Sequence, residues 1–262
     1  MISRIWSAYA VEIAKAIRQR HVYLGPALVL FVVVCAPLQY SLGGEHSNGF
    51  GFVAYATSIV NVLGLILILS YSASLVSSEL SSGAIRNVMV RPLYRHEFLA
   101  AKLLLGMSYA LLITLTTGAA SWAIAKGFGD VTAVSYGGEV IYTAYDMVRS
   151  YCLAVALALV PLSAGVAYAI TVSCLTRSTA AAVTGSIGIW LVVDIVKHRL
   201  HISAFLFSSY LESPWQVFKD RCDGLDSAWF PMATHAMLAS VGALLVFCAA
   251  AVAIFRRKDL HG

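Results

Sequence analysis

Six long apolar stretches alternate with shorter polar ones along the chain. They cover about residues 22–42, 50–76, 98–125, 148–175, 178–196 and 232–255. An α-helix rises 1.5 Å per residue, so about 20 apolar residues are enough to cross a hydrocarbon layer about 30 Å thick. The pattern predicts an all-α integral membrane protein with six transmembrane helices, in a single transmembrane domain that covers residues 1–262.

The first 20 residues show a different pattern, with apolar side chains at steps of three and four. One face of the predicted helix carries Ile2, Ile5, Trp6, Tyr9, Ile13 and Ile17. The opposite face carries Arg4, Ser7, Glu12, Lys15, Arg18 and Gln19. This periodicity is typical of an amphipathic helix that lies flat in the membrane interface, with an aromatic anchor. A simple membrane anchor would show the same pattern.

Composition and charge placement agree with this interpretation. The chain is 60% hydrophobic and only 12% charged, whereas a soluble domain is about a quarter charged. If the N-terminus is cytoplasmic, 12 of the 18 basic residues lie on the cytoplasmic side. Because cytoplasmic loops are rich in Lys and Arg, we expect both termini to be cytoplasmic.

Two larger segments then fall on the outer side. Residues 126–147 are polar and contain glycine, which favours a loop. Residues 197–231 contain the stretch "ISAFLFSSYLESPWQVF", which is too short to span the membrane but too apolar and aromatic to lie in water. For this second segment we expect helices at the outer interface or a re-entrant element, capping the end of the fifth span.

The stretch "SSELSSGAIRNVMVRPLYRHEFLAAKLL", residues 77–104, is unusually charged for a connection between two spans. Gly83 is a natural place for the preceding helix to end, and Pro92 suits the first turn of the next one. Between these two breaks the sequence predicts a short helix. Its apolar face contains Ile85, and its arginines are placed to meet an acidic partner.

The same residues carry a resemblance to a known family. Glu79-x3-Gly83, Arg91-Pro92-x2-Arg95 and Lys102 resemble the E-x3-G, P-x2-R and K signature of ABC type-2 exporter permeases. The order of elements is similar to that family over the whole chain. The resemblance implies a type V exporter-like fold, in which residues 79–95 are a coupling helix that docks on a cytoplasmic ATPase subunit. The implied docking residues are Glu79, Gly83, Ile85, Arg86, Arg91, Pro92 and Arg95.

The resemblance also implies an assembly of two permeases and two ATPase subunits in a bacterial inner membrane. The chain itself has no G-x4-G-K-[ST] phosphate loop and no ABC signature, so we expect ATP and Mg²⁺ to bind the partner ATPase. We therefore do not expect this chain to hydrolyse ATP. An accessory protein on the outer loops and membrane lipids are further expected partners.

Few polar groups lie inside the spans, which favours lipidic, amphipathic or peptide-like cargo over a small ion. Asn61 lies in the middle of the second span and is a candidate for the translocation path. Gly185 and Gly188 in the fifth span allow close approach of a second helix. They are candidates for a homodimer interface, and ordinary packing within one chain explains them equally well.

Three other interpretations stay open. Asp194, His198 and His201 share a helix face and form a weak candidate for a metal site. Ser186 in the fifth span and His235 in the sixth could form the dyad of an intramembrane serine protease. A non-transporting ABC permease, transmitting force or signal to an outer partner, fits the sequence as well as an exporter does.

Overall fold

The fold is described here from a computed structural model, which describes residues 2–42, 49–83, 94–128, 131–136, 139–197 and 199–257. Six of its helices are long and apolar enough to cross a membrane, and they fall on the six predicted spans. These helices are α2 (His21–Leu42), α3 (Gly49–Ser81), α5 (Arg95–Phe128), α6 (Ala144–Leu175), α7 (Thr179–Val196) and α9 (Trp229–Arg257). The chain is a multi-pass, all-α membrane protein, and this part of the prediction is confirmed.

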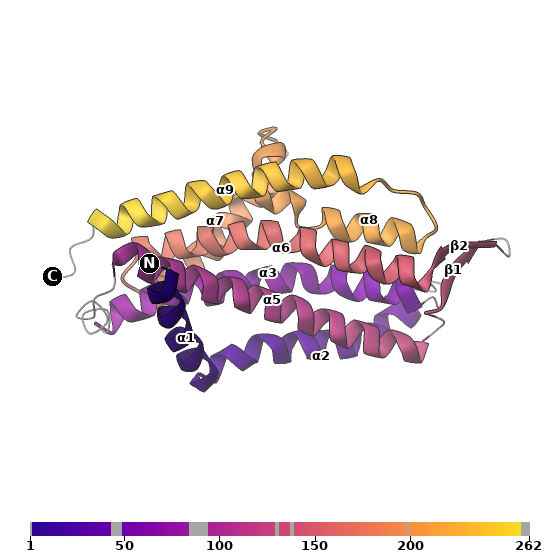
Figure 1. The fold of residues 1–262 in the computed structure, drawn as a ribbon, viewed down its shortest axis with the longest axis horizontal. Coiled ribbons are helices and arrows are strands. Elements are labelled where there is room, and N and C mark those ends of the chain that lie inside the picture. The colour runs from indigo at the N-terminus through magenta and orange to yellow at the C-terminus, as the bar shows by residue number, and fades with distance from the viewer. Residues whose placement is uncertain are drawn as a thin grey trace.

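The spans form an elongated bundle with α3 and α6 in its middle (Figure 1). Helix α3 contacts α2, α5, α6 and α7, whereas α6 also packs along α9. Close approach depends on glycine, because a Cβ at Gly106 of α5 would lie 2.5 Å from a Val166 methyl of α6. Small residues at helix contacts are the usual means by which membrane helices pack. Polar contacts add to this packing: the Ser77 amide of α3 donates to the Ser173 hydroxyl of α6.

A short β-hairpin extends beyond the end of the bundle that lies opposite the N-terminus (Figure 1). Its strands are β1 (Ala133–Tyr136) and β2 (Glu139–Thr143), paired antiparallel. This hairpin falls in the segment expected to be a polar loop. The signal was present in the sequence, because two β-rich runs flank a Gly-Gly pair. Thr143 then caps α6, since its side chain accepts from the Asp146 amide.

The apolar segment before the last span contains two 3₁₀ turns, η1 (Ser203–Phe205) and η2 (Phe207–Tyr210), and helix α8 (Ser213–Cys222). Helix α8 buries Trp215 and Phe218. It packs against α6 and α3. Helix α8 therefore lies along α6 and α3, whereas the first residues of the segment bond to the end of α7, where Leu200 N–H donates to Val196 O.

Helix α1 (Ile2–Arg18) lies across the other end of the bundle, at a steep angle to the spans (Figure 1). Trp6 and Ile17 are exposed, at 66% and 59%, as expected for side chains that enter a lipid interface. The side chains buried against the bundle come from a different face. They include Ala16 and the charged Glu12.

Candidate functional site

The charged stretch between α3 and α5 begins as the sequence predicts. Helix α3 ends at Ser81, and Gly83 has a φ of 69°, which is the left-handed conformation that glycine adopts at helix C-termini. Helix α5 begins at Arg95. The predicted coupling helix between them, with Ile85, Arg86, Arg91 and Pro92, lies outside the described residues.

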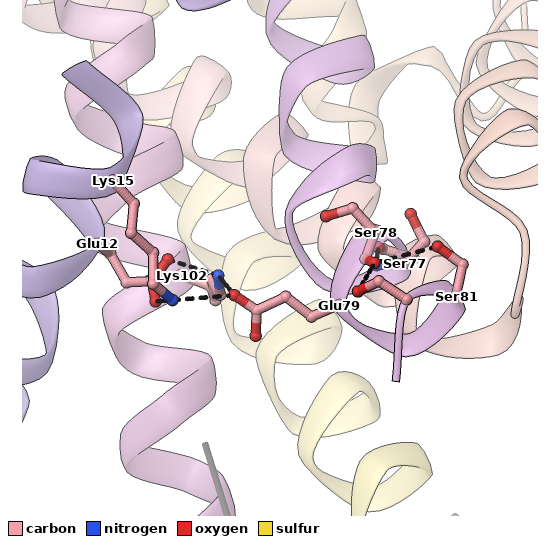
Figure 2. Close-up of polar contacts among 9 residues, drawn as sticks. Glu12, Lys15, Ser77, Ser78, Glu79, Ser81 and Lys102 are labelled. Atoms are coloured by element: carbon pink, nitrogen blue, oxygen red, sulfur yellow. Dashed lines mark hydrogen bonds and ion pairs between the residues drawn. The ribbon is translucent and has the colours of Figure 1, made fainter. Parts of the chain in front are cut away.

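Four charged side chains meet where these two helix ends approach α1 (Figure 2). The Lys102 ammonium of α5 donates to Glu12 Oε2 of α1 and to Glu79 Oε1 of α3, both at 2.6 Å. Lys15 of α1 lies 2.7 Å from Glu12 Oε1 and 3.4 Å from Glu79 Oε1. This charge cluster (Glu12, Lys15, Glu79 and Lys102) joins three helices that are distant in sequence.

The cluster is neutral and mostly buried. Lys102 is only 2% exposed and Glu12 only 7%, whereas the Lys15 side chain is 44% exposed. An unpaired charge at such depth would be very costly, so each buried ion needs its partners. Lys102 has two carboxylates and also lies 5.3 Å from the Phe98 ring centre. Two cations and two anions therefore form one interdependent unit.

The pairing changes the protonation of the two α1 residues. Burial by itself would raise the pKa of Glu12, but the charge and hydrogen bonds of Lys102, with those of Lys15, outweigh it and lower that pKa. Burial would lower the pKa of Lys15, but its bonds and attraction to Glu12 and Glu79 raise it. Both groups are held in their charged forms.

A second set of contacts fixes the start of α5. The Arg95 guanidinium donates to the carbonyls of Phe255 and Arg256, at 3.0 and 2.8 Å. These carbonyls belong to the last turn of α9, where a cation offsets the negative end of the helix dipole. Phe98 stacks on Phe255, with ring centres 5.7 Å apart. Arg95, expected to meet a partner subunit, thus also ties α5 to α9.

A cavity of about 840 Å³ lies beside the charge cluster. Glu12, Lys15, Glu79 and Lys102 all line it, together with residues from α2, α3, α5 and α7. Its volume falls in the range of about 300–1,000 Å³ that is typical of ligand sites. The cluster therefore forms one wall of a space that is large enough for a ligand.

The other candidate positions are dispersed. Asn61 lines a separate small cavity of about 30 Å³ within the protomer, between α3, α5, α6 and α8. A Cβ at Gly188 would meet nothing within 4 Å, and one at Gly185 would only touch Val172. Both glycines lie off the buried stripe of α7, which consists of Ala182, Ser186 and Trp190. Gly188 is thus on a side of α7 that is open to lipid or to another chain, whereas Gly185 lies beside Val172 of α6.

The residues of the candidate protease dyad and of the candidate metal site are not brought together in the described part of the chain. The Ser186 hydroxyl donates to Val183 of its own helix, and in the described part of the chain no hydrogen bond joins it to the exposed His235. Asp194 pairs with Lys197 at 2.6 Å. His198 lies outside the described residues, and among those described, His201 included, no three potential metal ligands gather.

Sequence reasoning placed two cluster members, Glu79 and Lys102, in the conspicuous charged stretch but missed the other two. Glu12 and Lys15 were assigned to the polar, water-facing side of α1. The sequence held a weak signal of this pairing. The first 20 residues contain four basic residues and a single acidic one, Glu12. Lys102, its partner on α5, is 90 positions away, so no local pattern could reveal that contact.

A comparison with protein families places the whole bundle in one family. The family model described as a protein of unknown function, DUF2705, matches residues 23–261. The chain belongs to the DUF2705 family. Membership in DUF2705 covers all six spans and the charged stretch between α3 and α5, but not α1. No curated protein matches the chain.

Proposed function

We propose that this DUF2705 protein is the permease subunit of an ATP-driven ABC transporter, an exporter that works with a separate ATPase subunit. One observation carries the proposal. The two ends of the charged stretch, Glu79 and Lys102, are bonded to each other and to α1 through a buried cluster. A loop that only returned the chain to the membrane would need no such anchoring.

The cluster supplies a physical route for force. In the proposed mechanism, the ATPase subunits close on ATP and displace the coupling segment, residues 79–95. Because Glu79 and Lys102 are held 2.6 Å apart, α3 and α5 move together. Glu12 couples this motion to α1, and Arg95 couples it to α9. Concerted tilting of packed helices is a common form of such transitions.

The remaining parts of the proposal follow the charge and apolar patterns. The gathering of basic residues at the end of the bundle that holds α1 and the last turn of α9 supports an orientation with both termini cytoplasmic. The proposed membrane is a bacterial inner membrane. The protein works as a homodimer, with Asn61, Gly185 and Gly188 near the path or the interface. Its cargo is lipidic, amphipathic or peptide-like.

The test is purification of the tagged chain from its native host in a mild detergent. We expect an ATPase with a phosphate loop and an ABC signature to co-purify in stoichiometric amount. The double substitution Arg86→Glu and Arg91→Glu should reduce its recovery at least tenfold, because it reverses two charges in the docking segment. Both positions avoid Arg95, which has a structural role of its own.

The matched control is Arg149→Glu, an exposed arginine of α6 at the opposite end of the bundle. This variant should retain the ATPase in full. A chain that purifies without any ATPase, or an ATPase that is recovered equally with the double variant, would contradict the proposal. The non-transporting permease is separated from the exporter by measuring cargo accumulation in vesicles.

A further inference from the structure

The cavity beside the charge cluster changes character along its length. Its lining runs from Leu67 on α3 to Ser82 in the turn after that helix, and the helical part, Leu67 to Glu79, corresponds to about 18 Å of helix. Four serines at steps of four residues form a polar stripe along this wall: Ser70, Ser74, Ser78 and Ser82. One end of the cavity holds the charges of the cluster, and the other is bounded by leucines. A site with this gradient suits an amphiphile that lies parallel to the spans.

The apolar side of the cavity faces the lipid. Leu24 and Leu28 of α2 line it and are 62% and 47% exposed on the surface of the protomer. On the inner side, the rings of Tyr71 and Tyr109 pack against each other, with centres 4.1 Å apart and planes tilted by 30°, and form an aromatic wall. A hydrocarbon chain can therefore lie along α2 and α3 without leaving the apolar phase.

The charged end has one unused acceptor and one adaptable donor. Glu79 Oε2 is buried and has no hydrogen-bond partner among the described residues. A buried carboxylate oxygen without a donor is costly, so it is a good place for a ligand N–H group. Lys15 is the adaptable donor, because its side chain is 44% exposed and its contact with Glu79 is long, at 3.4 Å.

This combination distinguishes among headgroups. An anionic headgroup without an N–H or O–H donor would leave Glu79 Oε2 unpaired, and any anionic headgroup would add negative charge beside two carboxylates. A purely cationic one would lie beside two lysines. A headgroup with a primary ammonium and a phosphate can pair with both side chains, since the ammonium donates to Glu79 and the phosphate accepts from Lys15. A quaternary ammonium has no N–H to donate.

We propose that this cavity binds one zwitterionic phospholipid with a primary ammonium headgroup. The headgroup lies between Glu79 and Lys15, and an acyl chain runs along α2 and α3. The site is a property of the single chain, so it does not depend on whether an ATPase subunit docks at residues 79–95. If the lipid proposal fails, the ABC transporter proposal still stands. If the ABC transporter proposal fails, the lipid proposal still stands.

The experiment uses the full-length chain in nanodiscs of phosphatidylcholine. Phosphatidylethanolamine with a photoreactive diazirine in its acyl chain is added, and labelled peptides are identified by mass spectrometry. We expect labelling of α2 around Leu24–Leu28 and of α3 around Leu67–Leu75. Excess unlabelled phosphatidylethanolamine should compete about tenfold better than phosphatidylglycerol or additional phosphatidylcholine, as expected for one charge-assisted hydrogen bond. Phosphoethanolamine, the soluble headgroup alone, should compete poorly.

Variants locate the site. Ser74→Phe fills the cavity wall and should reduce labelling at least tenfold. The matched control is Ser58→Phe on the same helix, because Ser58 is exposed and bonds to Tyr55 as Ser74 bonds to Tyr71. Ser58 does not line the cavity. This control should label like the unmodified chain.

Three results would overturn the proposal, and two of them need no variant. Equal competition by phosphatidylglycerol would remove the role of the ammonium. Competition by phosphoethanolamine as strong as that of the lipid would mean that the site takes a free headgroup and not a membrane lipid. Unchanged labelling in Ser74→Phe would place the lipid elsewhere on the surface.

Discussion

At the end of the bundle where α1 lies, four charged side chains join three helices, whereas aromatic rings join the helices at the opposite end. There, Tyr151 of α6 contacts Trp122, Trp215 and Phe218, with ring centres 5.4–5.8 Å apart. Aromatic pairs gain from area and shape, and they tolerate little movement. The charge cluster instead has a cavity beside it and one half-exposed member, Lys15. The two ends thus differ in what can rearrange: the aromatic end is a fixed base, and the charged end is the part suited to movement.

The largest expected effect comes from breaking the charged end. Lys102→Met removes the partner of two buried carboxylates, and it should lower the free energy of unfolding by about 3–5 kcal/mol. The measurement is unfolding by denaturant in detergent. Lys126→Met, at the exposed far end of the same helix, is the control and should change stability by less than about 0.5 kcal/mol.

A second substitution sharpens this test. Adding Glu79→Gln to Lys102→Met leaves only the neutral pair of Glu12 and Lys15, so part of the lost stability should return. A double variant that is less stable than Lys102→Met alone would argue that the cluster is not one neutral unit.

A smaller effect is expected at the aromatic end. Phe218 is fully buried, and Phe218→Leu should cost about 1–1.5 kcal/mol, because the swap loses ring contacts but keeps most of the volume. Its cost should be the same at every pH between 5 and 9. Phe205→Leu is the matched control, since Phe205 is 79% exposed.

The smallest and most specific effect is on pH dependence. Because pairing lowers the pKa of Glu12, the cluster stabilises the fold above the ordinary value of 4.5 and loses this contribution as pH falls through the lowered pKa. Because pairing raises the pKa of Lys15, that contribution is present below 10.5 and is lost as pH rises further. Stability should therefore be flat between these limits and fall on the acid side.

Glu12→Gln should flatten this acid limb, as measured by thermal unfolding in detergent from pH 3 to 7. An unchanged slope would mean that other carboxylates, and not Glu12, account for the acid loss. The Phe218→Leu variant should keep the acid limb of the unmodified chain, which separates the two ends of the bundle by chemistry as well as by position.

Features that depend only on residues close together in the sequence could be predicted from it. Apolar length predicts the six spans, and Gly83 predicts the end of α3, because both depend on neighbouring residues only. The apolar stretch ends near residue 76, and the helix continues through "SSELS" to the stop expected at Gly83. Ser77 shows how this polar turn is held, because its hydroxyl donates to Ala73 O of α3 and its amide donates to Ser173 of α6. The β-hairpin was missed because a polar, glycine-containing segment was taken as a loop without regard to its alternating pattern.

The site was less predictable because its contacts are distant in sequence. Glu79 and Lys102 stand out in a charged stretch, but no residue in that stretch indicates that Glu12 of α1 belongs to the same cluster. That pairing depends on how α1 crosses the bundle, which is set by packing against α5. Arg95 shows the same limit, since its contacts with α9 lie 160 and 161 residues away.

The distance between Glu12 and Lys102 also sets an order of assembly. The two residues are 90 positions apart, and ribosomes add about 5–20 residues each second, so α1 waits about 5–18 s for its partner to be synthesised. During that time Glu12 has only Lys15 beside it. The exposed Trp6 and Ile17 can hold α1 at the membrane surface until α5 has been inserted. Formation of the cluster then marks the moment at which the first half of the bundle closes.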